Sequence, residues 1–444
     1  MISTISNIID EINNLLWGKA TLILIFASGI FLTVRCGFIQ LIHPVRILKK
    51  TLLSPSEDCS EKSKGGISNL QALSTALGAS MGTGNIIGVA AAISVGGCGA
   101  VFWMILSAFV VMALAFTENV LGVHYKKRFR SEKNSCGALL YLDKGINSHG
   151  MAVLFAVACI TASFFTGNMS QVNSAASSLD NFGLPRVIIG AVFALAVAAV
   201  IFRGANFIAG VMEKIIPIIS IAYIFFSLVV IVLYGNNISE VITNIVKSAF
   251  GISQAAGGIM GTIINKSLSV GLRRGIFSNE AGMGSSVFAH TSAKCDDPTA
   301  MGMWAILEVF IDTVLCCTLT ALVILCTGAD EAGLGGADMV IFAFEKGIGE
   351  FSAYFIAAAN VIFAFAAVIG WYFYGEKCAV YLSPSGKLKT LYRIAYTSAA
   401  YAGAVISTDL IWKQADIFNA LMLFPNLAAI LILSNEAVPY AKSR

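Results

Sequence analysis

The chain has 444 residues, of which 57% are hydrophobic and only 12% are charged, and its formal net charge is +4 at pH 7. Soluble domains carry about a quarter charged residues, so this composition excludes an ordinary soluble domain. The apolar residues come in long runs rather than in the alternation of outer-membrane barrels, which favours helices in a bilayer. We therefore predict an all-α polytopic membrane protein in the lipid bilayer, and the charge gives no indication of a nucleic-acid partner.

Hydrophobic segments of spanning length follow one another along the chain. The residues before the first segment include Asp10 and Glu11 but no Lys or Arg, which a secretory signal needs, so we expect the first segment to be retained. At roughly 20 apolar residues per crossing, the pattern predicts about eleven transmembrane helices. Their expected ranges are 17–38, 68–93, 100–123, 151–178, 185–202, 211–234, 252–272, 300–328, 351–381, 391–408 and 415–434.

Lysine and arginine cluster in the short connections, and such clusters accumulate on the cytoplasmic side of a membrane. One orientation places every cluster on that side, with the N-terminus outside and the C-terminus in the cytoplasm. We therefore expect a multi-pass protein of the plasma membrane, in a prokaryotic cell. The clusters are Arg46, Lys49, Lys50, Lys62 and Lys64; Lys126, Lys127, Arg128, Arg130 and Lys133; Lys214; Arg273, Arg274 and Lys294; Lys377, Lys387, Lys389 and Arg393; and Lys442 and Arg444.

With the first helix set aside, the other spans divide into two sets of five with opposite orientation. The first member of each set, 68–93 and 252–272, is interrupted by glycine and polar residues, which is typical of an inverted-repeat transporter. We therefore expect an extra N-terminal helix and basic cytoplasmic loop over 1–66, a first repeat over 67–250, and a second repeat with the C-terminal tail over 251–444. The interruptions expected in 252–272 are Gly257, Gly258, Gly261, Asn265 and Lys266.

The residues with the clearest chemistry lie in the first interrupted segment. Gly82 and Gly84 flank Thr83, and glycine is costly inside a helix, so the helix is expected to unwind there. An unwound turn offers carbonyl groups to a hard cation such as sodium and N–H groups to a carboxylate, and a zwitterionic amino acid needs both kinds of partner. The neighbouring Ser80 and Asn85 favour a binding site over the alternative, a small-residue contact between helices.

Motifs along nearly the whole chain resemble those of the alanine/glycine:cation symporter family. The resemblance implies a LeuT-type fold with one extra N-terminal helix, and alternating-access symport of a small neutral amino acid, alanine or glycine, with sodium. The motifs are Ala72 to Leu77 with Gly82 to Ile86; Phe102 to Met104 before Glu118; Gly167 and Asn168 with Gln171 and Asn173; Glu213 and Lys214 before Pro217; Arg274 to Ser285 with Ala289 and His290; Phe310 to Thr313; Gly370 to Cys378; and Pro425 to Leu427.

The resemblance implies that the substrate site is lined by Gly82, Thr83, Gly84, Asn85, Gln171 and Trp371. The side-chain chemistry agrees, because Gln171 offers a carbonyl to an ammonium group and an amide to a carboxylate. Trp371 provides a rigid apolar wall that would limit the size of the substrate. The alternatives are an interhelical hydrogen bond for Gln171 and an interfacial anchor for Trp371.

Acidic residues inside spans are candidates for ion coupling, because burying them is costly. Glu308 and Asp312 are four residues apart and are expected on one helical face, where a shared proton or a cation could bind. Together with Ser80 and Thr83 they form the candidate ion-coupling set. For Glu118 we favour a position at the membrane edge, facing water.

Two departures from the family pattern bear on the coupling ion. The family commonly has a small residue at the position of Glu308, and hydroxyl residues just before Trp371, where this chain has Ala366 and Ala367. In LeuT-type folds such hydroxyls often complete a sodium site. Their loss leaves fewer oxygen ligands for a hard cation, so coupling to protons is the alternative to sodium.

Arg273, Arg274 and Glu280 are candidates for an inner gate, since the pattern places them at the cytoplasmic end of their span. A plain solvated turn is the alternative, because exposed ion pairs contribute little. The sequence Ser278-Asn279-Glu280 also reads as a cap at a helix start.

Other classes of protein lack support in the sequence. An uncoupled channel would need a repeated selectivity-filter segment, and a membrane enzyme would need a motif such as H-E-x-x-H. The cysteines contain no C-x-x-C spacing, and the four histidines are dispersed, so we expect no cofactor and no metal besides sodium. A transporter-like sensor stays an alternative. The sequence does not distinguish alanine from glycine, D-alanine or glutamine, and it gives no oligomeric state.

Overall fold

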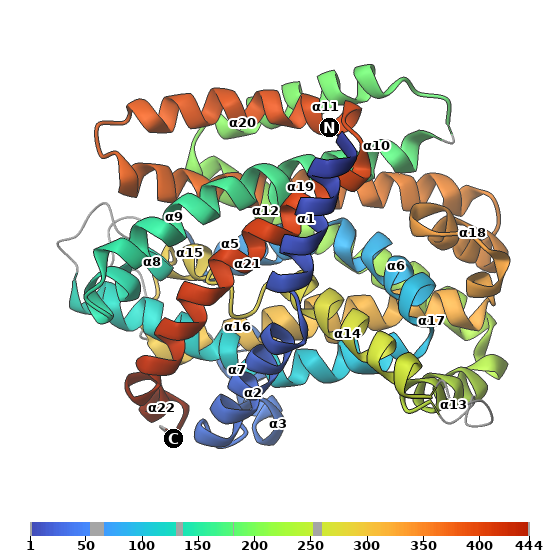
Figure 1. The fold of residues 1–444 in the computed structure, drawn as a ribbon, viewed down its shortest axis with the longest axis horizontal. Helices are drawn as coiled ribbons and strands as arrows, with labels where there is room; N and C mark the ends of the chain where they lie inside the picture. The colour runs from blue at the N-terminus through green and yellow to red at the C-terminus, as the bar shows by residue number, and fades with distance from the viewer. Residues whose placement is uncertain (1, 54–65, 130–135, 181, 252–259, 443–444) are drawn as a thin grey trace.

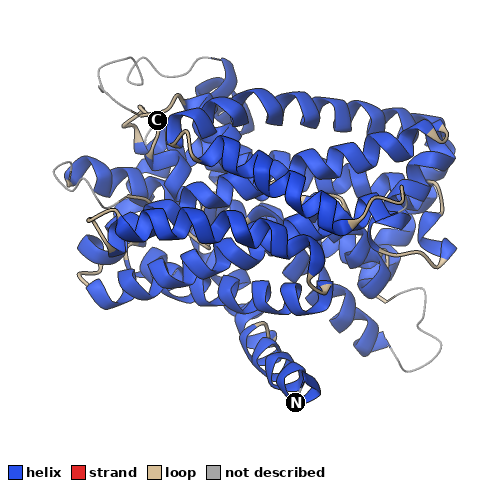
Figure 2. Ribbon diagram, turned by 90° about the horizontal axis from the view of Figure 1, so that it is seen from above, coloured by secondary structure: helices blue, strands red, loops and turns tan. Residues whose placement is uncertain are grey.

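The computed structural model describes residues 2–53, 66–129, 136–180, 182–251 and 260–442. Within these ranges the protein is helical, and its single β-type pairing is the bridge between Ile67 and Ala293 (Figure 2). This agrees with the all-α prediction. The helices of the first half are α1 (Ile2–Leu16), α2 (Lys19–Arg35), α3 (Ile39–Ile42), α4 (Pro44–Leu48), α5 (Asn69–Ser80), α6 (Ile87–Gly96), α7 (Gly99–Arg128), α8 (Ala138–Leu140), α9 (His149–Phe164), α10 (Ser170–Asp180), α11 (Arg186–Ile201), α12 (Ala205–Leu233) and α13 (Ile238–Ala249).

The second half continues in the same way and includes a π-helical stretch, η8 (Phe310–Cys317). A second π-helical turn, η5 (Phe165–Met169), joins α9 to α10, and a 3-10 turn, η3 (Thr83–Asn85), lies between α5 and α6. The remaining α-helices are α14 (Met260–Asn279), α15 (Val287–Thr291), α16 (Pro298–Val309), α17 (Thr318–Cys326), α18 (Gly336–Ile348), α19 (Phe351–Leu382), α20 (Lys387–Val405), α21 (Thr408–Ile432) and α22 (Ser434–Lys442).

Seven helices in the described part of the chain are long and apolar enough to cross a membrane. The other expected spans coincide with the interrupted pairs α5–α6 and α14–α15 and with α11 and α20, so the count of about eleven stays a prediction. The seven are Ile9–Arg35, Gly99–Arg128, His149–Asp180, Ala205–Leu233, Pro298–Cys326, Phe351–Leu382 and Leu410–Ile432.

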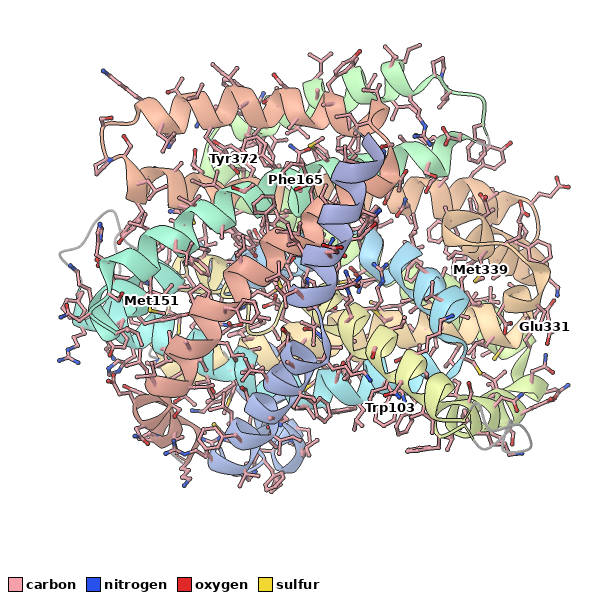
Figure 3. All side chains as sticks on the ribbon, in the orientation of Figure 1. Trp103, Met151, Phe165, Glu331, Met339 and Tyr372 are labelled. Atoms are coloured by element: carbon pink, nitrogen blue, oxygen red, sulfur yellow. The ribbon has the colours of Figure 1, made fainter. Side chains whose placement is uncertain are left out.

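Most of the long helices lie side by side along one direction (Figure 1). The short helices α13 and α18 lie at one end of this bundle, and α8 and α22 lie at the other. Figure 3 shows Glu331 and Met339 at the first end and Met151 at the second. We call these the α13 end and the α8 end. A cavity of about 500 Å³ at the α8 end is lined by Lys126 and Lys377, which belong to the predicted cytoplasmic clusters.

Two helices are broken and run in opposite directions, as the sequence predicts. At the α8 end, Ile67 just before α5 exchanges backbone hydrogen bonds with Ser292 and Lys294, just after α15. At the α13 end, Trp103 of α7 donates its indole N–H to the Ala249 carbonyl at 3.2 Å. The segment α5–α6 therefore runs from the α8 end to the α13 end, and α14–α15 runs back.

The first break, residues 81–86, lies where the sequence predicts it. Ser68 and Gln71 form a capping box that starts α5, and Gly82 leaves the helix with φ −96° and ψ −150°. The second break, residues 280–286, was predicted in the wrong place. Gly282 (φ 84°) and Gly284 (φ 75°) adopt the left-handed region that favours glycine, and Glu280 is there too at φ 54°.

The described residues that were expected to interrupt the second span do not do so. Gly261, Asn265 and Lys266 lie inside the continuous helix α14, and Gly257 and Gly258 lie outside the described residues. Isolated glycines cost a helix only about 1 kcal/mol, which packing can outweigh. The helix is instead interrupted after Glu280, where two glycines adopt the left-handed backbone conformation.

Candidate functional site

Asp312 joins the two broken helices in the interior of the bundle. Its carboxylate accepts the Asn85 side-chain N–H at 2.9 Å and the Ser278 hydroxyl at 2.8 Å. The neighbouring Thr313 hydroxyl donates to it at 2.7 Å, and Asn85 also donates to the Asp312 backbone carbonyl at 2.8 Å. Asp312 is fully buried, so water does not compete for these contacts. The first break and the end of α14 therefore meet at one carboxylate.

The oxygen atoms at this junction have the chemistry of a cation site. The Asn85 side-chain carbonyl oxygen is buried and has no hydrogen-bond partner among the described residues. A buried polar atom without a partner costs free energy unless a ligand satisfies it. The Asn85 backbone carbonyl is held by Thr320 at 2.8 Å, which fixes the position of the break. Hard cations prefer carboxylate, carbonyl and hydroxyl oxygens, and Asp312, Asn85 and Ser278 supply all three.

Ser80 and Thr83, the other predicted ion-coupling residues, lie at the same break. Ser80 ends α5, donates to the Ala76 carbonyl at 3.2 Å and also interacts with the Asp312 side chain. Thr83 is fully buried and contacts Gln171 instead of Asp312. Of the candidate set, Ser80, Thr83 and Asp312 therefore lie around one turn of unwound chain, with Ser80 on the side of Asp312, whereas Glu308 does not join them.

Gln171 holds the first break from the other side. Its side-chain carbonyl oxygen accepts the Thr83 backbone N–H at 3.0 Å and the Thr83 hydroxyl at 3.1 Å, while its amide donates to the Thr166 carbonyl at 3.2 Å. A Cβ atom at Gly82 would lie 2.5 Å from the same Gln171 oxygen. Any larger residue at position 82 would force the Gln171 side chain to move, and its hydrogen bonds to Thr83 with it.

Trp371 connects α19 to the second break. Its indole N–H donates to Glu280 at 2.9 Å, and the other Glu280 oxygen accepts the Ser285 hydroxyl at 2.6 Å. Trp371 is fully buried, and a Cβ atom at Gly167 would lie 2.1 Å from the Trp371 Cβ. The interior position agrees with a wall of the site and excludes the interfacial anchor.

Ala366 and Ala367 lie on the same helix, one turn before Trp371. Both are fully buried, and a Cβ atom at Gly82 would lie 3.2 Å from the Ala367 methyl group. Ala367 therefore faces the first break and offers it a methyl group, where a hydroxyl residue would have offered an oxygen.

Glu118 is a site residue that the sequence analysis placed wrongly. It is fully buried, and it accepts the backbone N–H groups of Gly282 at 3.2 Å and Gly284 at 3.1 Å, and the Asn426 amide at 2.8 Å. It does not face water at the membrane edge. An acid in the middle of α7 can be buried there because the second break presents free N–H groups to it.

Glu308 and Asp312 do not share a partner, contrary to the expectation of a common face. Glu308 lies 2.9 Å from the His290 ring nitrogen Nε2, and both side chains are buried. The helix changes from α to π at Phe310, which widens its turns and alters the direction of Asp312 relative to Glu308. Asp312 therefore faces Asn85, and Glu308 faces α15.

Arg273 and Arg274 do not lie at an end of their helix, and their described partners do not include Glu280. Because α14 continues to Asn279, both arginines lie in its interior, on the α13 side of the second break. Arg273 forms an ion pair with Asp416 of α21, and Arg274 lies 5.6 Å from the Trp412 ring centre. Neither Asp416 nor Trp412 was identified from the sequence.

Ser278, Asn279 and Glu280 end a helix instead of capping the start of one. The Asn279 side-chain oxygen accepts the Ala281 N–H at 3.1 Å, which satisfies a backbone donor as the chain leaves α14. The cap interpretation was wrong because these residue types also bind free N–H groups in turns.

Cavities open toward the site from both ends of the bundle. The cavity at the α8 end reaches Thr291, the last residue of α15, and Ser292, directly after it. At the α13 end, a cavity of about 280 Å³ is lined by Ile87 and Gly88, directly after the first break, and by Arg274 and Trp412. Asp312 and Trp371 lie buried between these two cavities.

A family model described as the sodium:alanine symporter family matches residues 2–443. The chain belongs to the sodium:alanine symporter family. It is 37% identical over 446 residues to the sodium/alanine symporter AgcS of Methanococcus maripaludis, covering 98% of this chain and 96% of the relative. It is also 37% identical over 437 residues to the probable sodium/glutamine symporter GlnT of Bacillus subtilis, covering 97% of this chain and 88% of that protein. Members of this family are transporters, and the chain is therefore a transporter and not an enzyme.

Solved structures support the same fold. The crystal structure of MhsT in complex with L-phenylalanine matches 84% of this chain and 100% of that chain, with a TM-score of 0.55 at 13% identity. A crystal structure of a mutant of the Eremococcus coleocola manganese transporter matches 85% of this chain and 81% of that chain, with a TM-score of 0.54 at 14% identity. This sodium:alanine symporter family member thus has the LeuT-type fold that its motifs imply.

Proposed function

We propose that this protein imports a small neutral amino acid, alanine or glycine, together with sodium by alternating access. The observation that carries the proposal is the Asp312 carboxylate, which bonds Asn85 of the first break and Ser278 at the end of α14. A cation bound at this junction would contact both broken helices at once. Its arrival would therefore favour one relative position of the two helices, which is what coupling requires.

Sodium is assigned to the Asp312 side of the first break. There the unpartnered Asn85 side-chain oxygen, the Asp312 carboxylate and the Ser278 hydroxyl converge, with Ser80 and Thr83 on the adjoining turn. On the opposite side Ala367 presents only a methyl group. A hard cation takes oxygen ligands, so the difference in chemistry favours the Asp312 side.

The substrate is assigned to the space between Gly82, Thr83, Gly84, Gln171 and Trp371. The unwound chain supplies N–H groups for a carboxylate, and the Gln171 side-chain oxygen is an acceptor suited to an ammonium group. Because Gln171 already bonds Thr83, the substrate would have to replace or share these hydrogen bonds. Trp371 and Ala367 are fully buried, and as walls of this site they would limit the substrate to one with a small side chain. A relative named for glutamine belongs to the same family, so the size limit is itself part of the proposal.

Orientation and repeats complete the proposal. Because Lys126 and Lys377 at the α8 end belong to basic clusters, we assign that end to the cytoplasm and the α13 end to the outside, with the N-terminus outside as well. Residues 67–250 and 251–444 form the two inverted repeats, and 1–66 lies outside them. Inward and outward movement of the broken helices would open the site to one cavity at a time.

Proton coupling is the second candidate. The buried pair of Glu308 and His290 offers titratable groups next to α15, in a position where the family commonly has a small residue. A Bacillus subtilis relative, 33% identical over 454 residues, is named a putative sodium/proton-dependent alanine carrier protein. This candidate replaces sodium by protons as the driving ion and leaves the substrate class unchanged.

Equilibrium binding to the purified protein tests the proposal. Sodium should raise the affinity for radiolabelled alanine, and alanine should raise the affinity for sodium by the same factor, because coupling between two sites is reciprocal. Potassium serves as the control cation. Alanine binding that is equally tight in sodium and in potassium would contradict the assignment of sodium to this site.

A further inference from the structure

The N-terminal helix α1 lies against the beginning of α21 (Figure 1). Asp10 lies 3.0 Å from the ammonium group of Lys413, and the Asn13 amide donates to the Lys413 backbone carbonyl at 2.9 Å. Trp17, which follows α1, donates its indole N–H to the Asp416 backbone carbonyl at 2.8 Å. A segment outside both proposed repeats therefore holds one turn of α21 through three side chains.

Trp17 also contacts Arg273, the residue that forms an ion pair with Asp416 in that turn of α21. The Arg273 guanidinium lies 5.6 Å from the centre of the Trp17 ring, within the range of a cation–π contact. Arg273 forms its ion pair with Asp416. Trp17 is only 5% exposed, whereas the Arg273 side chain is 33% exposed and that of Asp416 is 17% exposed, so the indole shields one side of a partly exposed ion pair. The Trp17 indole thus donates a hydrogen bond to the Asp416 backbone and also makes a cation–π contact with the Arg273 guanidinium.

The ion pair between Arg273 and Asp416 closes the α13 side of the site. It ties α14 to α21, and beside it Trp412 of α21 packs on Phe277 of α14 with ring centres 5.5 Å apart. Trp412 and Arg274 line the cavity at the α13 end. For that cavity to reach the site, α14 and α21 must separate here.

We propose that Trp17 is a positioning residue for this outer closure, holding Asp416 toward Arg273 and so favouring the outward-closed state. The inference rests on the proposed alternating access and on the orientation with the α13 end outside. Removing the indole should lower the ratio of closed to open protein roughly fivefold to thirtyfold, the effect of losing one or two moderate interactions. More protein would then face outward with its sodium site accessible.

The test is the sodium dependence of alanine uptake in proteoliposomes containing Trp17→Leu. The half-saturating sodium concentration should fall, because the outward-open state is already populated, and the maximal rate should fall, because closure has become unfavourable. Trp17→Phe keeps the ring over Arg273 but lacks the N–H donor, and its effect should be intermediate. Trp103→Leu is the matched control, since Trp103, labelled in Figure 3, also donates to a backbone carbonyl but bonds Ala249 instead of Asp416.

A double-mutant cycle separates positioning from general stabilisation. In an Arg273→Gln background there is no ion pair left to position, so Trp17→Leu should shift the half-saturating sodium concentration by less than about twofold. An equal shift in both backgrounds, no shift in either, or the same shift in Trp103→Leu would overturn the proposal. If Trp17→Leu does not fold, the cycle is read with Trp17→Phe.

Hydrogen exchange of the purified protein gives a readout that does not depend on transport. Trp17→Leu should speed exchange of the backbone amides in the first turns of α21, whereas Trp103→Leu should not. Unchanged exchange there would overturn the positioning role even if alanine is transported. If Trp17→Leu speeds amide exchange in α21 but the wild-type protein transports no alanine, the proposed function is refuted and the role of Trp17 in holding α21 still stands.

Discussion

The side-chain amide of Asn85 and the carboxylate of Asp312 meet at 2.9 Å, although 227 positions separate the two residues in the sequence. The contact joins the unwound turn of the first broken helix to the π-helical stretch that follows the second. Because both groups are buried, neither can leave without losing a hydrogen bond that water would not replace. This relationship places the proposed sodium site at the meeting point of the two broken helices.

Asp312→Asn should weaken sodium binding with little change in shape. The amide nitrogen cannot accept a hydrogen bond from Ser278 or Thr313, and the negative charge that favours a cation is lost. We expect the half-saturating sodium concentration for alanine uptake to rise at least about tenfold, which corresponds to about 1.4 kcal/mol. Asp330→Asn, at a short turn near the α13 end, is the control. Equal sodium dependence of wild type and Asp312→Asn would show that the carboxylate is not a ligand.

Gly167→Ala should destabilise the protein through a clash with Trp371. The added Cβ atom would lie 2.1 Å from the Trp371 Cβ, whereas nothing lies within 4 Å of a Cβ atom at Gly150 on the preceding helix. Overpacking of this kind costs about 1–3 kcal/mol. Thermal unfolding in detergent should therefore show a lower midpoint for Gly167→Ala and not for Gly150→Ala. In a Trp371→Gly background, which removes the Trp371 Cβ as well as the ring, the penalty should shrink; a penalty of the same size there would mean that the clash is with another residue.

Thr83→Val and Gln171→Leu should impair substrate binding to different degrees. Thr83→Val removes one of the two hydrogen bonds that Gln171 accepts from Thr83 and leaves the backbone N–H bond in place. Gln171→Leu removes both and also leaves the buried Thr83 donors without a partner, which costs about 1–3 kcal/mol. The KM for alanine should rise more in Gln171→Leu than in Thr83→Val. Wild-type kinetics in both variants would favour a purely structural contact at this break.

Glu118→Gln should loosen the second break. A glutamine has one acceptor oxygen in place of two, so it cannot satisfy Gly282, Gly284 and Asn426 together. A backbone N–H left without a partner costs about 1–3 kcal/mol, and the unfolding midpoint should fall accordingly. Glu331→Gln, on an exposed turn, should leave the midpoint unchanged. No difference between the two variants would mean that Glu118 does not stabilise the break.

The fold could be predicted from the sequence because length and hydrophobicity determine where helices cross a bilayer. Each of the expected segments contains a helix, and the first break was located because Gly82 and Gly84 lie next to polar residues that have no other reason to be buried. The second break was misplaced because Gly261, in the first turn of α14, looks the same in sequence as a glycine that stops a helix. The difference lies in the left-handed backbone at Gly282 and Gly284, which only the three-dimensional path reveals.

The site was predicted in part. Gln171 and Trp371 do lie against the two breaks, but Glu118 and Asp416 were missed because their partners come from distant parts of the chain. An acidic residue within a span can be recognised from the sequence. The backbone N–H groups that hydrogen-bond it, and so offset the free-energy cost of burying it, cannot. Arg273 was expected at the end of its helix but lies inside it, because the sequence pattern did not reveal that α14 continues to Asn279.

Uptake into proteoliposomes under defined gradients tests the central claim most directly. Radiolabelled alanine and glycine are supplied outside, with either an inward sodium gradient at equal pH or an inward proton gradient without sodium. The account predicts accumulation driven by sodium, lost in Asp312→Asn and kept in Asp330→Asn. Accumulation driven only by protons would move the coupling site to Glu308 and His290. Equilibration without accumulation would indicate an uncoupled facilitator, and no uptake of either amino acid would contradict the proposed substrate class or point to a sensor.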